Sequence, residues 1–143
     1  MFPGWQWYKS PHYRPLIMPS QRTAPVYLNL LRIRFPAGAI TSIAHRISGV
    51  LLFLSLPFLV YLLERSLQGP AGFEEAAQWL ACGWIRAGSV VIVWSLLHHL
   101  LAGIRFLLID LEIGVDMPAA RRSAWGVNLA AGLLALAWAG WIL

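Results

Sequence analysis

Long apolar runs separated by short polar stretches dominate the chain after residue 39. Three of these runs, at residues 40–63, 87–109 and 124–143, come near the roughly 20 residues that a helix needs to cross about 30 Å of hydrocarbon. Residues 73–80 mix glutamates and a glutamine with aromatic and aliphatic residues, which is typical of a short interfacial helix. The pattern predicts an all-α membrane protein with three transmembrane helices in an antiparallel up-down bundle, residues 40–143 forming a single transmembrane domain.

The first 39 residues differ from the rest because they hold six of the nine prolines of the chain. Proline prevents a long helix and favours extended backbone, so residues 1–39 are predicted to form an extended N-terminal arm. Trp5 and Trp7 lie close to Lys9 and Arg14 in this arm. Such mixing suits the headgroup level of a membrane or the surface of a partner, and the alternative is a partly disordered tail.

Composition and charge strengthen the membrane interpretation. Of the 143 residues, 59% are hydrophobic and only 12% are charged, which is too apolar for an ordinary soluble domain. The net charge of +5 comes mainly from arginines that flank the predicted spans, so nucleic-acid binding is not indicated. Basic residues gather before the first span and between the second and third, which predicts a cytoplasmic N-terminus and a C-terminus outside. The single cysteine, Cys82, excludes an internal disulfide and a multi-cysteine metal site in this chain.

A polar stripe interrupts the start of the first span. Ser42, His45, Arg46 and Gly49 are spaced i, i+3, i+4 and i+7, so they share one face of a helix that is expected to look toward partners. A hydroxyl and a guanidinium held together in a low-dielectric site suit a quinone carbonyl, whose oxygen gains negative charge during reduction. Two alternatives remain open: Ser42 caps the first turn, for which Thr41 is also placed, and Arg46 reaches out to lipid phosphates.

The second span carries a histidine pair. His99 lies about ten residues from the inner end, roughly 15 Å deep, where its imidazole could be an axial ligand of a b-type haem. The alternative is a hydrogen bond to a neighbouring helix. His98 points about 100° away and is predicted to pack or to hydrogen-bond between helices. His45 should lie about 6 Å from the depth of His99, which favours a second haem ligand from another subunit.

Two motifs occur in this three-span chain: Ser42-x-x-His45-Arg46-x-Ser48-Gly49, and His99-x-x-x-Gly103-Ile104-Arg105-Phe106 followed by Asp110. With these motifs the chain resembles the cytochrome b membrane-anchor subunits of succinate dehydrogenase, known as complex II. The resemblance implies that His99 is the haem iron axial ligand, that Ser42 and Arg46 bind quinone, and that His45 and Arg46 contact the haem propionates.

The same resemblance predicts the setting of the protein. It implies a bacterial inner (cytoplasmic) membrane, haem b as cofactor, and ubiquinone or menaquinone as substrate. The expected partners are a second membrane-anchor subunit, an iron-sulfur subunit and a flavoprotein subunit on which succinate oxidation takes place. Three alternatives remain: a fumarate reductase anchor, a haem-free structural anchor, and a small transporter, although a transporter would be expected to carry a mid-span carboxylate and none is found in the sequence.

Overall fold

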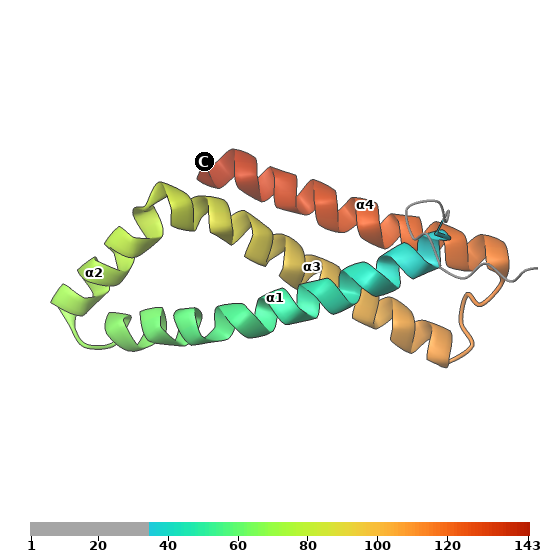
Figure 1. Ribbon diagram of the computed structural model, residues 1–143, viewed down its shortest axis with the longest axis horizontal. Coiled ribbons are helices and arrows are strands. Elements are labelled where there is room, and N and C mark those ends of the chain that lie inside the picture. The colour runs from blue at the N-terminus through green and yellow to red at the C-terminus, as the bar shows by residue number, and fades with distance from the viewer. Residues whose placement is uncertain (1–34) are drawn as a thin grey trace, which may run out of the picture. The chain divides into compact units, whose positions relative to one another are not determined.

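The structure is a computed structural model that describes residues 35–143, and the predicted arm lies almost entirely outside these residues. The described part is almost wholly helical (Figure 1). Its helices are α1 (Ala37–Ser66), α2 (Pro70–Ala81), α3 (Gly83–Asp110) and α4 (Met117–Ile142).

The three predicted spans are confirmed as α1, α3 and α4, each long and apolar enough to cross a membrane. The chain reverses direction from α1 to α3 and again from α3 to α4, and α1 crosses α3 near the middle of both helices (Figure 1). The helix α2 joins the far ends of α1 and α3, where their axes have diverged. All three spans extend beyond their apolar runs at one or both ends, because helical hydrogen bonding continues into flanking polar residues.

The start of α1 corrects one expectation. The helix begins at Ala37 with Pro36 at the N-cap and no side-chain hydrogen bond at that cap. Ser42 lies in the second turn, so the interpretation that it caps the helix is wrong. Pro36 has extended backbone, and its carbonyl oxygen accepts from the backbone N–H groups of Ala39 and Ile40, so the first helical hydrogen bonds form ahead of the apolar run.

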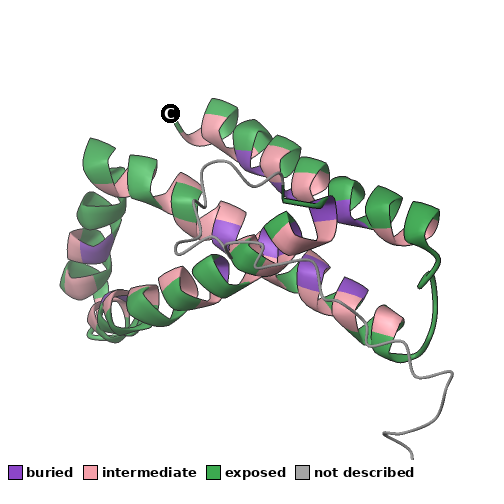
Figure 2. Cartoon of the chain, turned by 45° about the vertical axis from the view of Figure 1, so that its right-hand side comes forward, coloured by how far each residue is buried: buried purple, intermediate pink, exposed green. Residues whose placement is uncertain are grey.

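Small residues hold the spans together. Ala102, Ala124 and Ala131 are completely buried, and Figure 2 shows the buried positions on the sides of the helices that meet at their crossing. Large side chains such as Phe53 and Leu133 face outward. Close backbone approach through small residues is typical of membrane helices. Lipid tails are as apolar as leucine, so burying a large apolar side chain between helices brings no hydrophobic gain.

The short helix α2 confirms the predicted interfacial helix and is longer than expected. It begins after Gly69, whose φ of +106° is a left-handed conformation that favours glycine. Ala76 is its buried residue, and Arg65 near the end of α1 forms an ion pair with Glu75 of α2. These contacts fold α2 back onto α1.

Candidate functional site

Three polar side chains lie together inside the bundle, one from each span. His98 of α3 is 1% exposed, and its Nε2 lies 3.0 Å from Oδ1 of Asn128 on α4. The Thr41 hydroxyl of α1 donates to the same Oδ1 at 3.2 Å. This inner cluster (Thr41, His98 and Asn128) confirms the prediction that His98 bonds between helices.

The His99 side chain has different surroundings from that of its neighbour His98. It is half-buried at the crossing of α1 and α3, where its ring stacks on that of His45 with centroids 4.0 Å apart and planes 11° apart. Its Nδ1 lies 3.1 Å from the backbone oxygen of His45. A carbonyl oxygen can only accept, so this contact places a proton on Nδ1 and leaves Nε2 of a neutral ring with its lone pair.

The stacked rings correct the predicted depth difference. An offset of about 6 Å between His45 and His99 was expected from counting residues along straight helices, whereas the ring centroids lie only 4.0 Å apart, so their depths cannot differ by that much. The count fails because α1 starts earlier than expected and because α1 and α3 cross at an angle (Figure 1). Stacked face to face, the two rings leave no room for an iron between them.

Glycine makes this close approach possible. A methyl group at Gly49 would lie 3.0 Å from Cε1 of His99 and 3.3 Å from its Nδ1, closer than ordinary contact. Gly103, one turn after His99, faces His45 instead, and a methyl group there would lie 3.7 Å from Nε2 of that ring. Gly49 therefore sets how near α1 comes to the His99 imidazole.

The other predicted residues lie on the open side of α1. Ser42 is half-buried and Arg46 is exposed. Neither side chain finds a hydrogen-bond or ion-pair partner among residues 35–143. Together with the two stacked histidines they form what we call the outer stripe (Ser42, His45, Arg46 and His99). The predicted stripe thus divides, His45 and Gly49 facing α3 while Arg46 faces outward.

The arrangement of two buried or half-buried polar residues was not predicted from the sequence. No role was assigned to Asn128, because nothing in a single sequence tells which helices touch. Arg105 was identified only as part of the second motif, whereas its side chain is buried against α4 and bonds to Ser123 and to the backbone of Ala120. A basic residue five positions inside an apolar helix was the available signal.

Comparison with known proteins decides the family. A family profile described as "Succinate dehydrogenase/Fumarate reductase transmembrane subunit" matches residues 20–138. The chain belongs to this family. A Coxiella burnetii (strain RSA 493 / Nine Mile phase I) protein named "Succinate dehydrogenase cytochrome b556 subunit" is 42% identical over 104 residues, covering 72% of this chain and 83% of that protein. A Paracoccus denitrificans protein of the same name is 33% identical over 116 residues, covering 79% and 85%.

Membership of this family gives a reason for the polar side chains that lack partners among residues 35–143. A subunit of a membrane complex meets other subunits, and it can leave polar groups open for them. Within residues 35–143 the inner cluster forms hydrogen bonds among its own members but leaves Nδ1 of His98 and Nδ2 of Asn128 without a partner, whereas Ser42 and Arg46 have no side-chain hydrogen-bond or ion-pair partner at all.

Proposed function

We propose that this chain is the haem b-binding, quinone-reactive membrane anchor of a succinate:quinone oxidoreductase. The observation that carries the proposal is the contact between Nδ1 of His99 and the backbone oxygen of His45 at 3.1 Å, which would leave Nε2, without a partner among residues 35–143, as the nitrogen that binds a metal. Both relatives bear the name cytochrome b556 and are named for succinate dehydrogenase, which supports haem b and favours succinate oxidation over fumarate reduction.

The residues at the helix crossing fit a haem. A ligating imidazole is commonly oriented by a hydrogen bond from its other nitrogen, and His99 has one to a backbone oxygen. Gly49 and Gly103 let α1 and α3 come close to the two rings, which supports a fixed orientation of the ligating imidazole. A b-type haem held by His99 would supply one-electron chemistry. His45 and Arg46 would hold its propionates, and the second axial ligand would come from the second membrane-anchor subunit.

Ser42 and Arg46 are the proposed quinone ligands. They are four residues apart on α1, so the hydroxyl and the guanidinium share one face and can donate to the same carbonyl oxygen. Donors fixed before the reaction stabilise the negative charge that develops on that oxygen during reduction. The exposure of Arg46 in this chain alone fits a pocket that a partner subunit closes. The quinone is ubiquinone or menaquinone.

The complex would sit in the bacterial inner membrane with the N-terminus of this chain in the cytoplasm. The outer stripe begins in the second turn of α1, near that side. The iron-sulfur and flavoprotein subunits would dock there and deliver electrons from succinate. Succinate oxidation itself would belong to the flavoprotein.

The test uses the complete complex purified from membranes. Replacing Arg46 by leucine should lower succinate-dependent quinone reduction at least roughly tenfold, because the lost donor acts on a developing charge. Dye reduction by the soluble subunits should persist. Arg86→Leu, at the opposite end of the bundle in the first turn of α3, is the matched control and should leave both activities unchanged. If Arg46→Leu kept the wild-type rate of quinone reduction as well as of dye reduction, Arg46 would not belong to the quinone site. The haem is tested on the wild-type complex, where a reduced-minus-oxidised spectrum without a b-type band would contradict haem binding.

A further inference from the structure

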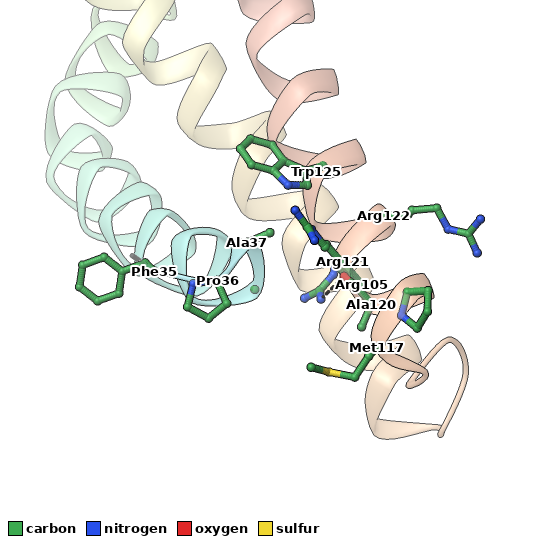
Figure 3. A pocket seen from close by; sticks show the side chains of 11 residues that line it. Phe35, Pro36, Ala37, Arg105, Met117, Ala120, Arg121, Arg122 and Trp125 are labelled. Atoms are coloured by element: carbon green, nitrogen blue, oxygen red, sulfur yellow. Dashed lines mark hydrogen bonds between the residues drawn. The ribbon is translucent and has the colours of Figure 1, made fainter. Parts of the chain in front are cut away.

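A cavity of about 1020 Å³ opens at the end of the bundle where α1 begins, α3 ends and α4 begins (Figure 3). Its wall holds three arginines, Arg105, Arg121 and Arg122, and no acidic side chain. Phe35 and Trp125 add aromatic surface. None of the residues of the outer stripe lines it, so the proposed function leaves this cavity without a role.

Arg105 carries a buried charge that its contacts do not balance. The residue is 7% exposed, its Nε donates to the Ser123 hydroxyl at 3.0 Å, and its Nη2 donates to the Ala120 carbonyl at 3.0 Å. Both acceptors are neutral. The ion pair found within residues 35–143 is the one between α1 and α2, far along the chain from Arg105. A buried guanidinium without a counter-ion is costly, so an anion from outside the described residues is expected.

The neighbouring arginines show where that anion would lie. Arg121 is exposed, and Figure 3 shows it reaching, like Arg105, toward the space between α1 and α4. Arg122 extends away from that space in the same view. The first turn of α4 also borders the cavity, and the partial positive charge of a helix N-terminus adds to the attraction for an anion.

We propose that this cavity binds the phosphate of an anionic phospholipid, with Arg105 and Arg121 as its ligands. Arg105 lies five residues before the end of α3, about 7 Å along the helix axis, which is the depth of a lipid headgroup in a spanning helix. Basic pockets between membrane helices bind anionic headgroups, and tryptophan favours the same level of the bilayer. Trp125 and Phe35 would contact the glycerol and the upper acyl chain, which a peptide carboxylate or free phosphate lacks.

The experiment uses the intact complex in nanodiscs of phosphatidylcholine with a minority of phosphatidylglycerol. Native mass spectrometry then counts the phosphatidylglycerol retained after the disc is removed. Arg121→Gln should weaken retention roughly fivefold, because it removes a basic group that reaches toward the bound phosphate. Arg105→Gln should weaken retention more, because it removes a buried charge that the phosphate would balance. Arg122→Gln, the matched control, should retain lipid as the wild type does.

Three results would overturn the proposal. The first is equal retention in all three variants. The second is displacement of the lipid by inorganic phosphate, which would make the cavity a general anion site. The third is loss of the iron-sulfur subunit from Arg105→Gln with the lipid count unchanged, which would identify the anion as a partner carboxylate. Arg121→Gln alters an exposed residue, so it keeps the proposal testable even if Arg105→Gln does not assemble. The haem spectrum is a separate measurement. A spectrum without a b-type band would contradict the proposed function and leave the lipid proposal unaffected.

Discussion

His98 and His99 are neighbours in sequence and have opposite roles in the structure. His98 is buried and bonded to Asn128 inside the bundle. His99, rotated by about 100° on the same helix, is half-buried, and its Nε2 has no hydrogen-bond partner among residues 35–143. The comparison teaches that adjacent polar residues of one membrane helix can have different surroundings, because one faces the other two spans of the chain and the next faces the open helix crossing.

The largest expected effect is the difference in haem content between the His99→Ala and His98→Ala variants. His99→Ala should reduce the haem content of the purified complex at least roughly tenfold, because loss of an iron ligand costs more than loss of a supporting residue. His98→Ala should retain haem and instead lower the free energy of unfolding by about 1–2 kcal/mol, since Asn128 loses a buried hydrogen-bond partner. The pyridine haemochrome assay and thermal unfolding measure the two effects. Equal haem loss in both variants would contradict the division of roles.

A smaller effect is expected where α1 approaches His99. Gly49→Ala would place a methyl group 3.0 Å from Cε1 of that ring, and relieving the overlap should cost about 1–3 kcal/mol. The shifted ring should also change the midpoint potential of the haem, which redox titration would measure.

Gly132→Ala is the matched control for this substitution. No atom lies within 4 Å of a methyl group at that helical position, so alanine should raise stability by about 0.5–1 kcal/mol. If Gly49→Ala behaved like Gly132→Ala, in both stability and potential, the close approach of α1 would have no bearing on His99.

The smallest effect is expected at the edge of the inner cluster. Thr41→Val keeps the shape of the side chain but removes the hydroxyl that donates to Asn128, and it should cost roughly 0.6 kcal/mol. Haem content and quinone reduction should stay at the wild-type level. A change in the haem spectrum of Thr41→Val would show that the inner cluster and the outer stripe are coupled.

The sequence predicted the helices well because the length of an apolar run alone decides whether a helix can span a bilayer. It also predicted the interhelical hydrogen bond of His98, since the faces of one helix follow from residue spacing. It missed Asn128 as the partner, and it misjudged the relative depth of His45 and His99. Both errors concern the angle and register between helices. Those depend on close contacts such as Gly49 against His99, which hydropathy does not encode.

The sequence was sufficient to propose the residues of the outer stripe as a site. Spacing showed that Ser42 and Arg46 share a face, and the structure leaves both without a partner among residues 35–143. Arg105 is part of the second motif, but its burial was not predicted, because an arginine near the end of a span is usually taken to reach for the surface. Its burial depends on Ser123 and Ala120 of another helix, which only a three-dimensional arrangement brings near.

The oxygen that orients His99 belongs to the main chain at position 45, not to the histidine side chain. Any residue that keeps α1 helical there presents the same acceptor. Replacement of the side chain at position 45 would therefore keep this hydrogen-bond acceptor and remove only the ring that stacks on His99.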